Sequence, residues 1–181
     1  MRRIACVGAV VLALFAAAAV GLAAHQAPST KSVSATFAVT PSTQNRVTTC
    51  TGADGDYTRI DGSYAGTSTS ADARLAGAIK IKGQSLVNKT TGLGWMRGTV
   101  RIDTSSDENT KANLTAVISG GQLNGFLNGR VHDASANLLG GFSAAFGATG
   151  ITGGSIGSTS STPALVLTGS CHRGKKEKEN K

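Results

Sequence analysis

A period-two alternation of apolar and polar residues recurs along this chain and constrains its fold more than any other feature. The clearest example runs from Leu123 to Val131, where Leu, Gly, Leu, Gly and Val alternate with mostly polar residues. Similar stretches cover residues 33–39, 75–82, 113–118, 138–146 and 164–168. Successive side chains of a strand point to opposite faces of a sheet, so this period predicts β-strands, and no sustained helical period competes with it.

The links between these stretches are short and rich in glycine. Ser119-Gly120-Gly121-Gln122 is the strongest hairpin signal, because paired glycines accept the positive φ angles of a two-residue turn. Residues 147–150 and 157–162 predict two further turns. Short links favour antiparallel neighbours, since parallel strands need long crossovers. The sequence therefore predicts an all-β fold, an antiparallel meander of about eight to ten strands.

Two arguments favour a small closed barrel over a β-sandwich, which is the alternative. Gly125 and Gly129 alternate with large residues on one face, which suits the tight curvature of a small barrel. Closure also removes exposed sheet edges. Within residues 85–103 we expect a short strand, a turn at 89–92 and a longer strand, with bulges or bends at Gly94 and Gly98.

The N-terminus has the pattern of a secretory signal peptide covering residues 1–24. Arg2 and Arg3 precede an apolar run that fades into small residues up to Ala24. This predicts a secreted, extracellular protein, either free or associated with the cell envelope, with no transmembrane domain after cleavage. The alternative is an uncleaved anchor, because Ile4 to Ala24 is long enough to span a bilayer. The alanine-rich signal and the Gly/Ala/Thr-rich body favour a bacterial source.

Two cysteines remain once Cys6 leaves with the signal. In an oxidising compartment, Cys50 and Cys171 predict one disulfide, which closes a ring of about 120 residues and stabilises the fold by about 4–5 kcal/mol. The alternative is a pair of redox-active thiols, which no C-x-x-C spacing supports. We therefore divide the chain into the signal, an N-terminal segment with a first strand (25–45), a disulfide-closed β domain (46–171) and a charged, disordered tail (172–181).

The net charge of +8 is concentrated at the two ends of the chain. Residues 25–171 hold eleven basic and eight acidic residues, and the tail holds five basic and two acidic ones. A body that is only mildly basic argues against nucleic-acid binding. The tail predicts at most a weak, salt-sensitive tether to an anionic envelope polymer or a membrane surface.

Signals for catalysis or metal binding are sparse. His132 is the sole histidine of the body and would be a general base at a barrel mouth, near Arg130, or else a solvent-facing residue at a strand end. Asp54, Asp56 and Asp61 offer oxygen ligands for Ca²⁺, but their spacing fails the EF-hand pattern, and turn-forming Asp-Gly pairs explain them without a metal ion. We expect no cofactor and no metal, and the sparse signals favour a protein that is not an enzyme.

The leading functional hypothesis is a secreted, non-catalytic binding module that holds a small apolar ligand or a partner at a barrel mouth. Its candidate lining residues are Trp95, Met96, Tyr57 and Tyr64, although a domain this poor in aromatic residues favours core packing for them. The alternative is an envelope-associated structural or interaction protein that works through its outer face and its tail. A third hypothesis is an isomerase or cyclase built around His132.

Overall fold

The computed structural model describes residues 31–104, 109–131 and 136–157, and all of these except Lys31 belong to one compact unit. They form nine strands and one short 3-10 helix, η1 (Ala73–Leu75). The strands are β1 (Ala35–Pro41), β2 (Arg46–Gly52), β3 (Gly55–Thr69), β4 (Gly77–Asn88), β5 (Gly94–Asp103), β6 (Asn109–Ser119), β7 (Gln122–Arg130), β8 (Asn137–Gly147) and β9 (Gly150–Gly157).

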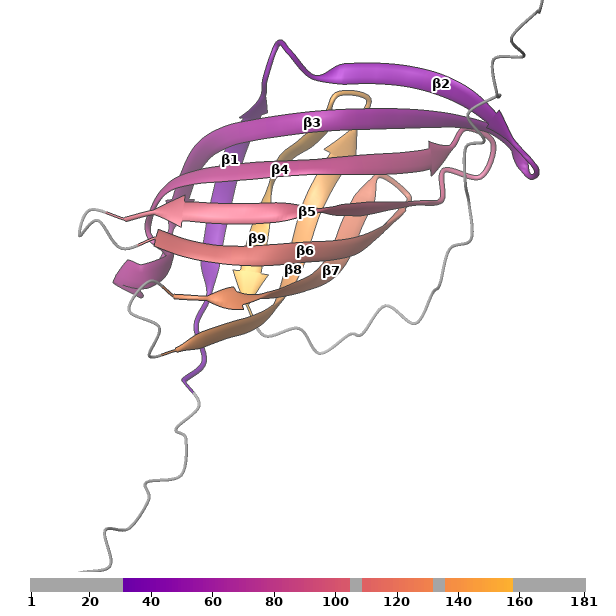
Figure 1. Ribbon diagram of the computed structural model, residues 1–181. Helices are drawn as coiled ribbons and strands as arrows, with labels where there is room; N and C mark the ends of the chain where they lie inside the picture. Colours follow the sequence, from indigo (N-terminus) through magenta and orange to yellow (C-terminus); the bar gives the residue numbers. More distant parts are fainter. Residues whose placement is uncertain (1–30, 105–108, 132–135, 158–181) are drawn as a thin grey trace, which may run out of the picture. The chain divides into compact units, whose positions relative to one another are not determined.

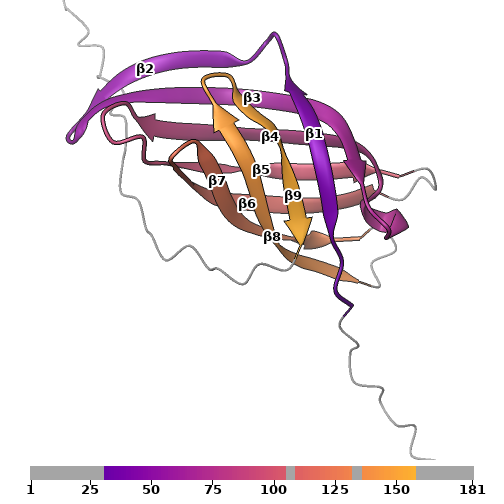
Figure 2. The same ribbon diagram turned by 180° about the vertical axis from the view of Figure 1, so that it is seen from behind.

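The strands close into an antiparallel barrel (Figures 1 and 2). The sheet order is β1-β9-β8-β7-β6-β5-β4-β3-β2, and an additional pairing between β1 and β3 closes the ring. Eight strands thus make the barrel wall, and β2 is an extra strand. The predicted all-β meander and closed barrel are confirmed, and the sandwich is excluded.

The extra strand exists because β3 is 15 residues long and outruns the barrel. β1 pairs with the second half of β3 and β2 with its first half, so β1 and β2 lie end to end along one edge. Of the two Asp-Gly turns that the sequence predicted around Asp54 and Asp61, one is confirmed and one is wrong. Asp54-Gly55 does join β2 to β3, but Asp61-Gly62 lies inside β3. Large apolar residues of β3 fall on both faces, with Tyr57 outward and Ile60 and Tyr64 inward, so no apolar–polar alternation marked this strand in the sequence.

Several predictions about glycine are now decided. Gly120 and Gly121 have φ values of 57° and 75°, and they form the predicted hairpin turn. A Cβ on Gly125 would lie 2.2 Å from the Thr115 carbonyl oxygen, so the strands there approach more closely than a side chain permits. The predicted bulges at Gly94 and Gly98 are wrong, because the β4–β5 and β5–β6 registers run through both positions without a shift.

The barrel interior is filled with side chains. Phe37 and Phe142 stack there with ring centroids 5.2 Å apart. Leu75 of η1 enters the interior at one end, held by the Ser68 hydroxyl, which donates to the Leu75 carbonyl oxygen at 2.7 Å. Inward residues of the barrel strands make up the rest of the core, among them Val39, Tyr64, Ile79, Ile81, Met96, Val100, Ile102, Leu114, Ile118, Leu123, Leu127 and Ile156. A filled interior is the usual state of a barrel this small.

Several predicted features lie outside the described residues: the signal peptide, His132, the turn at 157–162 beyond Gly157, the strand at 164–168, Cys171 and the tail. The Cys50–Cys171 disulfide therefore stays a prediction. None of the helices in the described ranges is long and apolar enough to cross a membrane.

Candidate functional site

The four predicted lining residues do not meet at one opening. Tyr64 and Met96 point inward, each with 1% of its surface exposed, and both belong to the core. Burial raises the pKa of Tyr64 above its ordinary value, so its phenol is neutral. Tyr57 and Trp95 follow the opposite parity on β3 and β5 and point outward. A small ligand at a barrel mouth remains an untested prediction.

The predicted acidic and histidine candidates are also dispersed. Asp56 accepts a hydrogen bond from the Thr51 hydroxyl at 2.8 Å. Asp61 accepts from the Gln84 amide at 2.7 Å and from Arg59, and these bonds lower the pKa of its carboxyl. Asp54 is exposed at the β2–β3 turn. Across residues 31–104, 109–131 and 136–157, no three such side chains gather where they could hold a metal ion; His132 lies outside these ranges.

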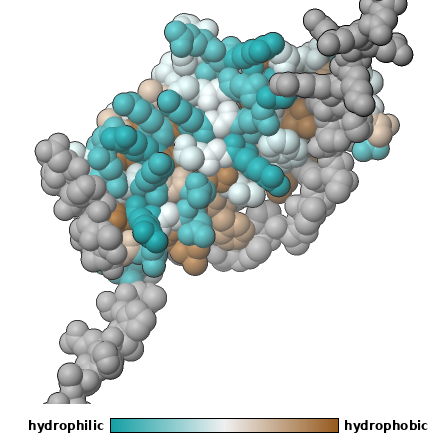
Figure 3. All heavy atoms as spheres, in the orientation of Figure 1, coloured by the Kyte–Doolittle hydropathy of each residue, from teal (hydrophilic) through white to brown (hydrophobic). Residues whose placement is uncertain are grey.

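The structure instead assembles a site that the sequence order conceals. Lys80 of β4 lies directly opposite Arg101 of β5, Arg101 lies opposite Lys111 of β6, and Lys111 lies opposite Arg130 of β7. All four side chains are exposed on the outer face, and we call them the cationic row. Figure 3 shows hydrophilic side chains gathered over this part of the wall. With neighbouring strands about 4.8 Å apart, the row spans about 14 Å.

Acidic residues compensate only part of this charge. The Asp103 carboxylate lies 3.8 Å from the Lys80 ammonium and accepts a hydrogen bond from Arg101. Lys111 and Arg130 make no ion pair with any residue in the described ranges. Lys82, two positions along β4 from Lys80, extends the positive surface. Asp107 and Glu108 lie outside the described residues.

Like charges directly opposite one another destabilise a sheet by a few tenths of a kcal/mol to about 1 kcal/mol per pair. Three such pairs in succession make the cationic row costly for the barrel, and a neutral or alternating row would be more stable. The chemistry of the row suits anions. Arg101 and Arg130 present planar forks that match phosphate or carboxylate, and Lys80 and Lys111 add compact point charges.

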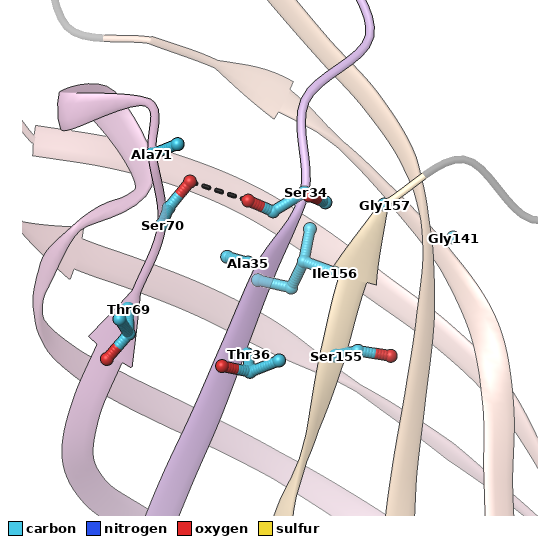
Figure 4. Close-up of a pocket in the computed structure, with 10 residues that line it drawn as sticks. All are labelled: Ser34, Ala35, Thr36, Thr69, Ser70, Ala71, Gly141, Ser155, Ile156 and Gly157. Atoms are coloured by element: carbon cyan, nitrogen blue, oxygen red, sulfur yellow. Dashed lines mark hydrogen bonds between the residues drawn. The ribbon is translucent and has the colours of Figure 1, made fainter.

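The described surface also contains a hollow of about 450 Å³ where β1, β9 and the end of β3 meet (Figure 4). Its rim carries the hydroxyls of Thr36, Thr69 and Ser155, which sit opposite one another across the three strands. The Ser70 hydroxyl donates to the Ser34 carbonyl oxygen, so one polar pair of the lining is already satisfied. The lining contains no charged or aromatic side chain, and this hollow offers less specific chemistry than the cationic row.

Sequence reasoning could not find the row, because its members lie at positions 80, 101, 111 and 130. Only the registers of three strand pairs bring them together. The available signal was the position of Lys80, Lys82 and Arg130 on the polar faces of predicted strands.

Comparison with known proteins finds no matching family model, no matching curated protein and no matching solved structure. A function for the chain must therefore be argued from its own geometry and charge.

Proposed function

We propose that the protein is an exported, non-catalytic binding module that holds an anionic polymer of the cell envelope on its cationic row. One observation carries the proposal: four cations from four adjacent strands face solvent directly opposite one another, with one described carboxylate among them. The row is a locally unfavourable arrangement that bound anions would relieve.

A polymer fits the row better than a single small anion. An isolated exposed ion pair is worth only about 0–1 kcal/mol. A chain with repeated phosphate or carboxylate groups engages several members of the row at once, and the later contacts are intramolecular and therefore favoured. Such binding weakens steeply with salt, because each neutralised anion releases condensed counterions.

Export supports the same partner. The N-terminal pattern of residues 1–24 and the cysteine pair Cys50 and Cys171 favour an oxidising compartment outside the cytoplasm. Anionic polymers of a bacterial envelope lie in that compartment. The tail, with five basic and two acidic residues, would add attraction of the same sign. This proposal joins the binding module and the envelope-associated protein of the sequence analysis into one function.

The test measures binding of fluorescently labelled long-chain polyphosphate and polyglutamate by anisotropy. Lys111→Glu should weaken binding about tenfold, since it replaces an attractive contact by a repulsive one. Lys89→Glu is the matched control: it makes the same charge change at an exposed turn near the other end of the barrel, and it should change affinity little.

Equal weakening by both variants would show that net charge alone attracts the polymer, and the row would lose its role. Loss of binding on deletion of residues 172–181, with no effect of Lys111→Glu, would assign the interaction to the tail. A native mass spectrum with a bound small molecule would favour the barrel-mouth hypothesis instead.

A further inference from the structure

The hollow shown in Figure 4 is lined by residues of β1, β3, β8 and β9 and of the segments next to β1 and β3. It lies on the far side of the barrel from the cationic row, because β1 and β9 are in front in Figure 2, whereas β4, β5 and β6 are in front in Figure 1. Its volume of about 450 Å³ is in the usual range for small-molecule sites. The hollow and the cationic row are therefore two separate features of the surface.

Three hydroxyl side chains stand in one row at this hollow. Thr36 of β1 is directly opposite Thr69 of β3 and Ser155 of β9. All three are exposed and lie on the outer face, since Ala35 and Ile156, of opposite parity, belong to the core. We call Thr69, Thr36 and Ser155 the hydroxyl row. With neighbouring strands about 4.8 Å apart, the row extends over about 10 Å.

The fold does not use the hydroxyls of this row. In the described parts of the chain, none of the three makes a hydrogen bond to another residue. Nearby hydroxyls do have structural partners, as when Ser70 donates to the Ser34 carbonyl oxygen. Each hydroxyl of the row can both donate and accept a hydrogen bond. Threonine favours exposed strands by propensity alone, so the row gains a role only together with the shape of the hollow.

The hollow is open because of a glycine that the barrel does not require. A Cβ on Gly157 would lie 3.6 Å from the Ser34 Cβ, which is an ordinary contact, and the φ angle of Gly157 is outside the left-handed region. By contrast, a Cβ on Gly154 of the same strand would collide with the Ser143 carbonyl oxygen. Glycine weakens a strand relative to residues with a side chain. Gly157 therefore keeps the hollow open at a cost to stability, whereas Gly154 is needed for strand packing.

The lining indicates the chemistry of a ligand. It contains no charged side chain, so an ion held there would lose hydration without gaining a partner. It combines the hydroxyl row with the apolar residues Ala35, Ala71 and Ile156. A sugar ring has the same two kinds of surface, because its hydroxyls project from the edge and its C–H groups form the faces. We propose that the hollow binds a neutral sugar residue of a glycan, with the hydroxyl row bonded to the edge of the ring.

The first experiment records amide NMR spectra of the full chain during titration with tetrasaccharides of glucose, mannose, galactose and N-acetylglucosamine. At least one of them should bind and shift the signals of residues 34–36, 69–71 and 155–157. The affinity should not change with salt, because the ligand is neutral. The proposal would be overturned if none of the four sugars bound at millimolar concentration, or if the shifts lay away from the hollow.

The second experiment repeats the titration with variants of the lining. Thr36→Val removes one hydroxyl at nearly constant shape and should weaken binding about fivefold, the usual net effect of one hydrogen bond. Thr67→Val is the matched control, because Thr67 is exposed on the same face of β3 but lies opposite Ala38 and outside the lining. Gly157→Leu should abolish binding by filling the hollow, whereas Gly147→Leu, at an open and exposed position, should not. Equal affinities of Thr36→Val and Thr67→Val would overturn the proposal, as would full binding by Gly157→Leu.

The two proposed sites can be tested separately. Lys111→Glu should leave sugar binding unchanged, and Thr36→Val should leave polyphosphate binding unchanged. Polyphosphate should not compete with the sugar, because the cationic row is on the other side of the barrel. Competition between the two ligands would show that the sugar binds at the row, and the assignment to the hollow would be wrong.

Discussion

The same two strands carry two opposite kinds of outward surface. On β4 and β5, Lys80 opposes Arg101 near one end, and Leu86 opposes Trp95 six residues along each strand. The charged pair is exposed, whereas Leu86 is 4% exposed. Alternation assigns both pairs to the outer face, yet the charged pair is hydrated whereas Leu86 is buried. The face of a strand therefore does not fix the environment of its side chains, and the neighbours across the sheet decide it.

The largest expected effect on stability comes from placing a charge at Leu86, which is buried, and comparing it with the same change at Leu139, which is exposed. Leu86→Asp should destabilise the protein by about 3 kcal/mol, since it buries an unpaired carboxylate. Leu139→Asp should change the free energy of unfolding by no more than about 0.5 kcal/mol, because Leu139 is 78% exposed. Urea unfolding of both variants gives the two values. Similar losses would show that Leu86 is not buried in the folded protein.

Removing a charge from the cationic row should stabilise the barrel, whereas adding a charge at Leu86 should destabilise it. Lys111→Gln removes like-charge repulsion with Arg101 and Arg130 and should stabilise the barrel by about 0.5–1 kcal/mol. The gain should shrink in high salt, since screening already weakens the repulsion. Lys89→Gln is the control and should be neutral. A destabilised Lys111→Gln would mean that Lys111 makes a favourable contact, and the cost assigned to the row would be wrong.

A smaller effect is expected when the carboxylate beside the row is neutralised. Asp103→Asn removes the partner of Lys80 and Arg101 and should lower stability by about 0.5 kcal/mol, as these are surface pairs. The same change should strengthen polyphosphate binding, because the row gains net positive charge. Anisotropy and urea unfolding on one sample measure both. Weaker binding would contradict the assigned site.

The smallest expected effect on stability concerns Asp61. It lies opposite Gln84, between the levels of Lys80 and Leu86 on β4. Its pKa is lowered below the ordinary 3.8, chiefly by the Gln84 amide. The folded state therefore gains stability from Asp61 above pH 3.8, and that gain is lost as the pH falls through the lowered value. Unfolding of Asp61→Asn should show a weaker loss of stability than the parent protein as the pH falls from about 5 to about 3. If the stability of the two proteins depended on pH in the same way, the lowered pKa of Asp61 would be contradicted.

The sequence predicted the barrel from residues that obey one strong rule, the alternation of side chains on strands. Leu123 to Val131 and the Gly120-Gly121 turn required nothing else. The first half of β3 escaped because its inward positions Thr58, Ile60 and Gly62 hold only one large apolar side chain, while the outward position 57 holds a tyrosine. Tyr57 and Tyr64 are both tyrosines of β3, and the sequence alone does not distinguish them. They point to opposite faces, which the unbroken register of β3 with β4 reveals. The cationic row depends on three registers at once, and no local pattern contains that information.

The most direct test of the central claim measures the thermal stability of the parent protein and Lys111→Gln with and without long-chain polyphosphate. A ligand that binds the folded state stabilises it by RT ln(1 + [L]/Kd), so at a given concentration a tighter ligand raises the melting temperature more. The account predicts that Lys111→Gln melts at a higher temperature alone, and that polyphosphate raises the melting temperature of the parent protein more than that of Lys111→Gln. If polyphosphate raises both melting temperatures equally, the cationic row is not where the polymer binds.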